Sequence, residues 1–160
     1  AVATRMARAA ARATSARGGV MSYEKALEAA GATIHAFESF GSYQGDWWAL
    51  VTAGGVTGWV SGSFGSCSGC DAFEAEFGYA DDKCSEHEYS KDCPTCEPCK
   101  AKAVEFQSRL ASFGGGYLDS LMSQDEAEKR AAQNLEWDGD AQQMLDWVKA
   151  HSVESIMEPK

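Results

Sequence analysis

Alternating side chains predict a β-hairpin in the first half of the chain. Residues 47–52 place large apolar groups on both faces of an extended strand. One face holds Trp47, Ala49 and Val51, and the other holds Trp48, Leu50 and Thr52. Residues 53–55 read Ala-Gly-Gly, which favours a tight turn, and residues 56–60, VTGWV, return as a second strand. Trp47, Trp48 and Trp59 are therefore predicted core residues, with the adjacent pair on opposite sides of a small twisted sheet.

Weaker patterns predict the other elements. Ser22 suits the N-cap of a short helix over residues 23–30, with Gly31 as its stop. Residues 32–40 alternate like a strand, with Ile34, Ala36 and Glu38 on one face. A helix is expected from Pro98 until residues 114–116, Gly-Gly-Gly, end it. Residues 71–77 fit either a short helix or a strand.

The C-terminal third reads as helical. Residues 123–126, Ser-Gln-Asp-Glu, form a capping box that predicts a helix to about residue 135. A last helix is expected from Asp138 or Asp140 through Val148, followed by a frayed end. The predicted fold class is α+β: a small antiparallel β-sheet with a Cys-rich metal-binding loop and about three C-terminal helices.

All six cysteines lie between residues 67 and 99. Pairs separated by two residues can turn both side chains onto one ion, and two such pairs supply the four tetrahedral ligands that zinc prefers. The pairs are Cys67/Cys70, Cys84/His87 and Cys93/Cys96, with Cys99 three residues further on. The intervening segment is polar, so a bound ion would supply order that a small core cannot.

The favoured zinc ligands are Cys67, Cys70, Cys93 and Cys96, which resemble a two-knuckle zinc ribbon. Cys84 and His87 with one flanking pair form the second choice, and Cys99 is read as a spare thiol. Six reduced cysteines without an ion, disulfides in a secreted protein and an iron–sulfur cluster are the alternatives.

The cysteine motifs also allow two kinds of catalytic site. Residues 67–70, CSGC, precede a possible helix, and residues 96–99, CEPC, look locally like a thioredoxin active site. The residues before the second motif are polar rather than a buried strand, which argues against that fold. His87-Glu88 lacks the spacer of the zinc deaminase motif H-x-E, and its two halves lie too close together. No catalytic residue is predicted.

Charge divides the chain into an arm and a body. Residues 1–19 hold eight alanines, four arginines and no acid, whereas the formal net charge of the whole chain is −10. The arm is read as a helix, a leader or transit segment, or an assembly device for a homo-oligomer, and residues 20–160 as one zinc-stabilised α+β domain. The acidic body repels phosphates, so direct nucleic-acid binding is not expected, and no apolar run is long enough to span a bilayer.

Two resemblances rest on particular motifs. Residues 45–62 are similar to the later strands of bacterial Src-homology-3-type domains, where a GDWW strand, a tight turn and a GWV strand follow one another. The segments GSYQGDWW and GSCSGCDAFEAEFG, followed by CSEHEYS and DCPTC, resemble a family of uncharacterised proteins of actinobacteria and their phages. That likeness covers roughly residues 21–150 and implies a phage or bacterial origin.

These observations predict a noncatalytic, zinc-stabilised interaction module that meets a protein partner in the cytoplasm of a bacterial host cell, and the resemblance implies that a phage or a bacterium encodes it. An acidic inhibitor or DNA mimic, acting on a host nucleic-acid-binding protein, is one alternative. A thiol-redox or metal-dependent enzyme is the other.

Overall fold

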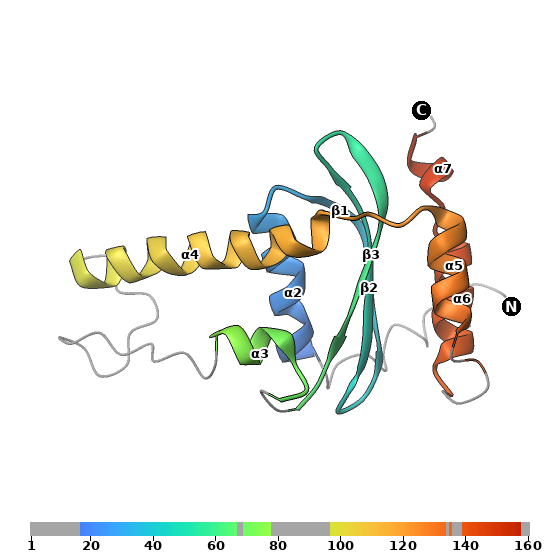
Figure 1. The fold of residues 1–160 in the computed structure, drawn as a ribbon, viewed down its shortest axis with the longest axis horizontal. Helices are drawn as coiled ribbons and strands as arrows, with labels where there is room; N and C mark the ends of the chain where they lie inside the picture. The colour runs from blue at the N-terminus through green and yellow to red at the C-terminus, as the bar shows by residue number, and fades with distance from the viewer. Residues whose placement is uncertain (1–16, 67–68, 78–96, 134, 136–138, 158–160) are drawn as a thin grey trace, which may run out of the picture.

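The computed structural model describes residues 17–66, 69–77, 97–133, 135 and 139–157 (Figure 1). In chain order the elements are α2 (Arg17–Ala29), β1 (Thr33–Gly41), β2 (Gly45–Ala53), β3 (Val56–Phe64), α3 (Ala72–Phe77), α4 (Glu97–Leu118), α5 (Gln124–Ala132), α6 (Ala141–Ala150) and α7 (Val153–Met157). The strands form one antiparallel sheet in the order β1-β2-β3. The α+β class is confirmed, with four helices after residue 96 where about three were expected.

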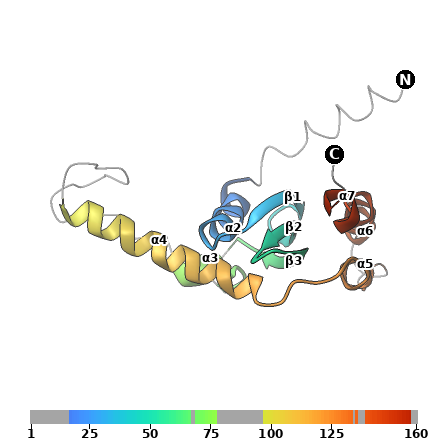
Figure 2. The same cartoon turned by 90° about the horizontal axis from the view of Figure 1, so that it is seen from above.

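The sheet is the middle of three layers. Helices α2, α3 and α4 cover one face, and α5, α6 and α7 cover the other (Figures 1 and 2). Each face has its own apolar cluster. The first cluster includes Tyr23 and Leu27 of α2 with Trp47, and the second includes Trp48, Trp59 and Val148. The sheet therefore buries large side chains on both sides.

The central strand β2 contributes buried side chains to both clusters. Residues 47–51 are all buried, and the rings of Trp47 and Trp48 are 0% and 3% exposed. Successive side chains of a strand point to opposite faces, so the two tryptophans anchor opposite clusters. The predicted hairpin and its face assignment are confirmed, since β2 and β3 pair from Gly45↔Phe64 to Ala53↔Val56. Gly54 and Gly55 form the turn with positive φ.

Strand β1 departs from the predicted alternation. Its pairing with β2 shifts register between Ile34 and Ala36, so His35 is an extra residue in a β-bulge. Ile34 and Phe37 consequently pack on the α2 side, and Ala36 packs on the α6 side. The prediction that Ile34 and Ala36 share a face was wrong, because the bulge reverses the side on which the following residues point.

Helix α4 passes through the glycines that were expected to end it. It runs to Leu118, and a Cβ atom at Gly114 would lie 1.9 Å from the carbonyl oxygen of Ala26. Gly114 therefore marks the closest approach of α4 to α2. The prediction of a helix stop was wrong, since the glycine serves contact between two backbones rather than a left-handed turn.

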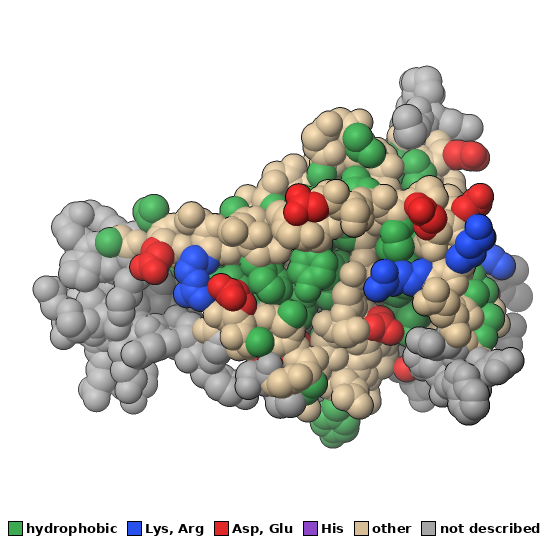
Figure 3. Space-filling model, viewed as in Figure 1, with side chains coloured by type: hydrophobic (Ala, Val, Ile, Leu, Met, Phe, Trp, Pro, Cys, Tyr) green, Lys and Arg blue, Asp and Glu red, His purple; other side chains and the backbone are tan. Residues whose placement is uncertain are grey.

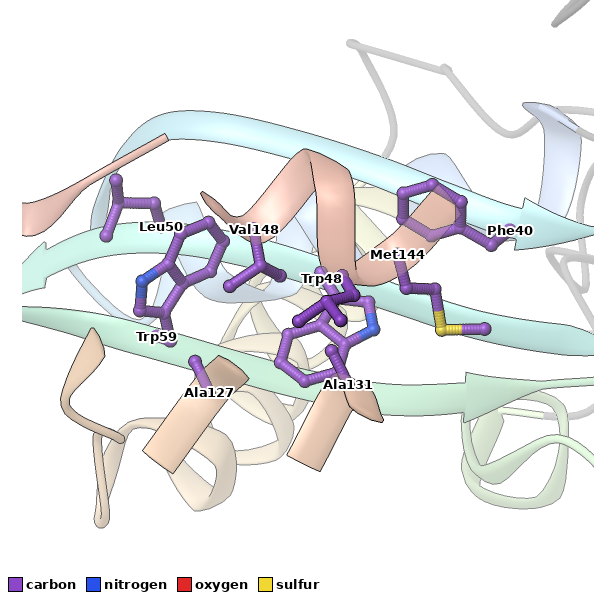
Figure 4. Close-up of a cluster of buried hydrophobic side chains, with 9 residues drawn as sticks. Phe40, Trp48, Leu50, Trp59, Ala127, Ala131, Met144 and Val148 are labelled. Atoms are coloured by element: carbon purple, nitrogen blue, oxygen red, sulfur yellow. The ribbon is translucent and has the colours of Figure 1, made fainter. Parts of the chain in front are cut away.

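Gln124 hydrogen-bonds to both β3 and α6 on the side of the sheet that α5, α6 and α7 cover. Its Oε1 accepts a hydrogen bond from Nε1 of Trp59 at 2.9 Å, and its Nε2 donates to the Val148 carbonyl at 3.1 Å. Figure 4 shows Trp59, Val148 and Trp48 side by side between β3 and the helices that cover it. The preceding residue, Ser123, forms the predicted capping box with Glu126, which is confirmed. The hydrogen bond from the Ser123 N–H lowers the pKa of the Glu126 carboxyl.

Other helix boundaries differ from the sequence expectations. Helix α2 begins at Arg17 rather than after Ser22, so it includes the last residues of the predicted arm. Helix α5 ends at Ala132, and the expected frayed end contains α7. The last predicted helix is confirmed as α6, with Asp140 at its N-cap. In the described part of the chain, no helix combines the length and apolar character needed to cross a bilayer.

The contact at Gly114 makes a sharp stability test. Gly114→Ala is expected to destabilise the protein by about 1–3 kcal/mol, because the added methyl group forces α4 away from α2. Gly115→Ala is the matched control: its Cβ meets nothing within 4 Å. A helical alanine there should stabilise by about 0.5–1 kcal/mol. Urea denaturation of both variants measures the difference, and equal stabilities would contradict the close approach.

Candidate functional site

A buried carboxylate organises the chain just after β3. Asp71 is 4% exposed and accepts hydrogen bonds from the hydroxyl of Tyr23 at 2.7 Å and the Gly65 N–H at 3.0 Å. The same carboxylate accepts from the backbone N–H groups of Phe73 at 2.9 Å and Glu74 at 3.2 Å. These last two bonds cap the first turn of α3. Asp71 thereby ties together α2, the end of β3 and α3.

The electrostatics of this group follow from its burial. Tyr23 is 1% exposed, and its hydroxyl also accepts a hydrogen bond from the Phe73 N–H at 3.1 Å. Burial, followed by the hydrogen bond to Asp71, raises the pKa of Tyr23 far above its usual value of 10. Burial and the charge of Asp71 also raise the pKa of Tyr117. The neutral phenol of Tyr23 is therefore the form that satisfies the buried carboxylate.

Cys70 lies directly before this buried carboxylate. A Cβ atom added to Gly65 would lie 2.6 Å from the Cys70 sulfur, so the chain folds back closely between the two residues. Cys70 is exposed, it is disulfide-bonded, and it is the only cysteine whose side chain lies among the described residues. The Asp71 hydrogen bonds thus hold an exposed sulfur at a fixed place beside the end of β3.

The remaining predicted ligands are not described. Cys67, Cys84, His87, Cys93 and Cys96 lie outside the described residues, and Cys99 is placed only through the backbone of the first turn of α4. Among the described residues, no three histidine, cysteine or acidic side chains gather as metal ligands. The zinc assignment therefore stays a prediction.

Aromatic contacts hold α3 against α4 where the cysteine-rich segment leaves the body. The ring of Phe77, the last residue of α3, lies 5.4 Å from the ring of Phe106 and 5.5 Å from that of Phe113. The Arg109 guanidinium lies 5.1 Å from the centre of the Phe77 ring and donates to the Glu76 carbonyl at 2.8 Å. These contacts hold the C-terminal end of α3 against the middle of α4.

A separate cavity of about 220 Å³ lies between the sheet and the α5–α6 pair. Polar groups line much of it: Ser63 donates to the Asp46 carboxylate at 2.8 Å, and Arg130 comes from α5. Trp48 forms part of its wall, but its Nε1 atom is shielded from solvent and has no hydrogen-bond acceptor in the described part of the chain. The cavity lies on the opposite face of the sheet from Tyr23, and none of the described residues that line it is a cysteine.

The two described histidines each contact a neighbouring residue of the fold. His35 Nε2 lies 2.7 Å from the Thr52 hydroxyl across the strand pair. His151 follows α6 as its C-cap, with Nδ1 2.8 Å from the Trp147 carbonyl. Neither ring faces a cysteine among the described side chains.

Comparison of the chain with protein-family models, curated proteins and solved structures finds no match. The resemblance drawn from the aromatic and cysteine motifs therefore stays a prediction. The candidate site rests on the geometry around Asp71 and Phe77.

Sequence reasoning missed the role of Asp71 and Tyr23. The two residues are 48 positions apart, and nothing local to Tyr23 indicates a buried carboxylate partner. A signal was present at Asp71, because an aspartate three residues before Glu74 has the spacing of a helix N-cap. That spacing also favours a helix over a strand for residues 71–77.

Removing the Tyr23 hydroxyl tests the Asp71 group. Tyr23→Phe is expected to destabilise the protein by about 1–3 kcal/mol, because the buried carboxylate loses a donor that water cannot replace. Tyr43→Phe is the matched control, since Tyr43 is 82% exposed. Chemical denaturation near neutral pH measures both, and a Tyr23 variant as stable as the control would contradict the proposed coupling.

The raised tyrosine pKa values predict alkaline sensitivity. Because folding holds Tyr23 and Tyr117 in their neutral forms, their contribution to stability is complete below pH 10 and falls as pH rises beyond it. The free energy of unfolding should begin to drop near pH 10, where the tyrosines of the unfolded chain ionise, and should keep falling as pH rises further. The double variant with phenylalanine at both positions should show a shallower drop. A slope unchanged by the double substitution would show that other groups cause it.

Proposed function

We propose that this protein is a noncatalytic interaction module whose cysteine-rich segment is stabilised by a zinc ion. The ligands in the reduced protein are Cys67, Cys70, Cys93 and Cys96. The observation that carries the proposal is that the folded body holds the N-terminal side of the cysteine-rich segment, residues 67–99, at two points. Asp71 holds Cys70 beside β3, and Phe77 holds the exit of α3 against α4.

The spacing along α4 limits where the segment returns. Phe106 contacts Phe77 and lies nine residues after Glu97, which is about 14 Å of helix at 1.5 Å per residue. Phe77, where α3 ends, therefore lies beside α4 at a point about 14 Å along the helix from Glu97, where α4 begins. The sequence between these two points is polar and has little apolar area to bury, so coordination free energy would supply the missing stability.

Zinc and the disulfide compete for the same sulfur. Coordination requires the Cys70 thiolate, whereas a disulfide-bonded sulfur carries no such charge. The proposed zinc-bound state therefore belongs to the reduced protein, as expected in a reducing cytoplasm. Oxidation would release the ion and leave a disulfide beside Asp71.

A protein partner suits the exposed surface near the segment. The first half of α4 extends beyond the sheet (Figure 1), and Val104 and Phe106 on it are 72% and 38% exposed. With a net charge of −10 the chain repels nucleic acid. On the face drawn in Figure 3, acidic side chains lie among lysines and arginines, which favours a protein contact over imitation of DNA.

Thiol–disulfide exchange is the second candidate function, because one observation favours it. Cys70 is both exposed and disulfide-bonded, and α3 begins two residues later. Such a sulfur is open to attack by an external thiolate. Under this function the reduced protein would transfer electrons to a disulfide substrate.

Metal analysis of the reduced protein decides between the two functions. The protein prepared with a reductant and zinc, then desalted, should hold about one zinc per chain and lose thermal stability with a chelator. Cys67→Ser and Cys96→Ser should each abolish binding, because a closed site needs all four ligands. Cys99→Ser is the matched control and should keep the ion.

Three outcomes would count against the proposal. Reduced protein without zinc, whose melting temperature ignores a chelator, contradicts the structural ion. The same protein reducing insulin disulfides in repeated turnovers would establish the second candidate. Loss of zinc in Cys99→Ser together with retention in Cys96→Ser would show that the ligand set is wrong.

A further inference from the structure

Among the residues that the structure describes, the sheet has one covered edge and one open edge. Met122, in the segment that joins α4 to α5, pairs with Trp59 of β3 through two backbone hydrogen bonds of 2.8 Å. Figure 2 shows this segment passing the β3 side of the sheet. Within the described residues, no backbone hydrogen bond from outside the sheet reaches strand β1. An unpaired strand edge offers a row of donors and acceptors to another chain.

The pairing pattern identifies the groups on that edge. Trp59 turns its N–H and C=O toward Met122 and away from β2, and successive residues of a strand alternate in this direction. Following the register across the sheet, Ala36, Glu38 and Phe40 turn toward β2. Phe37 and Ser39 consequently turn their backbone groups outward.

The side chain of Glu38 already accepts a hydrogen bond from one of these outward backbone groups. The Ser39 N–H donates to Oε1 of Glu38 at 3.0 Å, a bond between neighbouring residues that leaves the β2 ladder intact. The carboxylate thus stands in for the carbonyl oxygen that an added strand would bring. An incoming strand would take the Ser39 N–H and free a negative charge at the new junction.

We propose that β1 is a docking edge for an extended, basic segment of a partner protein, which adds a fourth strand beside Phe37 and Ser39. This surface deepens the proposed function, because it rests on the protein being an interaction module and names how one partner binds. The chemistry of the partner follows from the two faces of β1. Phe37 lies on the α2 face, stacked on Trp47 at 5.8 Å, and offers an apolar neighbour. On the opposite face, Glu38 offers a carboxylate.

Charge selects this occupant over a second copy of the chain. Two copies that each carry a net charge of −10 repel one another, and β1 holds no lysine or arginine to offset Glu38. A strand that alternates apolar and basic residues meets Phe37 with one face and Glu38 with the other. Its charges also favour encounter with the acidic protein.

A labelled peptide tests the edge directly. The probe is a peptide of about eight residues that alternates valine and lysine and carries fluorescein, titrated with the full chain at low salt. We expect saturable anisotropy that weakens with added salt, and no binding by the valine–glutamate peptide. Glu38→Gln should weaken binding by about two- to fivefold, whereas Glu105→Gln, which removes the same charge from exposed α4, should not.

Ser39→Pro isolates the backbone contact. Proline removes the outward N–H while sparing the ladder to β2, so the variant should fold and bind the peptide about tenfold or more weakly. Ser39→Ala keeps the N–H and should bind as the original chain does. A lysine–valine peptide with alternate nitrogens methylated makes the same test on the unaltered protein, and should also fail to bind.

Several results would overturn the docking edge. Equal binding by Ser39→Pro or by the methylated peptide would place the contact elsewhere. A wild-type dimer that becomes monomeric in Ser39→Pro would make a second copy the occupant. Zinc content separates this inference from the proposed function: Ser39→Pro should retain the ion, so a failed docking edge leaves the metal result unaffected.

Discussion

Burial of β2 on both faces is the constraint on which the structure depends. A three-stranded sheet with one apolar face would need one layer of helices, but adjacent Trp47 and Trp48 require two. The chain meets this demand by placing α2, α3 and α4 on one side and α5, α6 and α7 on the other (Figure 2). Two hydrogen-bonded groups then secure the layers: Asp71 with Tyr23, and Gln124 with Trp59.

This arrangement limits where function can reside. Helices cover both faces of the sheet, so apart from the cavity of about 220 Å³ beside Trp48, ligands are left with the margins of the fold. One margin is the exposed edge of β1, and another is the end of β3, where Asp71 holds Cys70 and the cysteine-rich segment begins. The two margins differ in chemistry, since one offers backbone hydrogen bonds and the other offers sulfur. The proposed interaction module, with its proposed metal-stabilised segment, would use both.

Local features could be predicted from the sequence, whereas features that depend on contacts between distant elements were missed. The β2–β3 hairpin and the Ser123 capping box are encoded within a few residues each, so alternation and spacing sufficed. Gly114 was misread because a glycine run usually ends a helix, and the carbonyl of Ala26 that explains it lies in another element. The bulge at His35 was missed for a related reason: a single inserted residue shifts the alternation without leaving a compositional mark.

The candidate site divides in the same way. The spacing of the cysteines predicts a metal, and the site geometry adds the buried carboxylate that positions Cys70. The partnership of Asp71 with Tyr23 bridges 48 positions, so it exists only once the sheet and α2 have packed. Spacing rules describe ligands that are neighbours in sequence, and they do not reach the residues that hold those ligands in place.

Residue-resolved amide hydrogen exchange tests the central claim most directly, because it reports both the buried strand and the exposed edge. The account predicts uniformly slow exchange for Trp47 to Val51 of β2. Along β1 it predicts alternation, with slow amides at Ala36, Glu38 and Phe40 and fast ones at Phe37 and Ser39. If the amides of Phe37 and Ser39 in the free monomer were as protected as those of Ala36, Glu38 and Phe40, the edge would already be covered. Fast exchange throughout β2 would contradict its place at the centre of the fold.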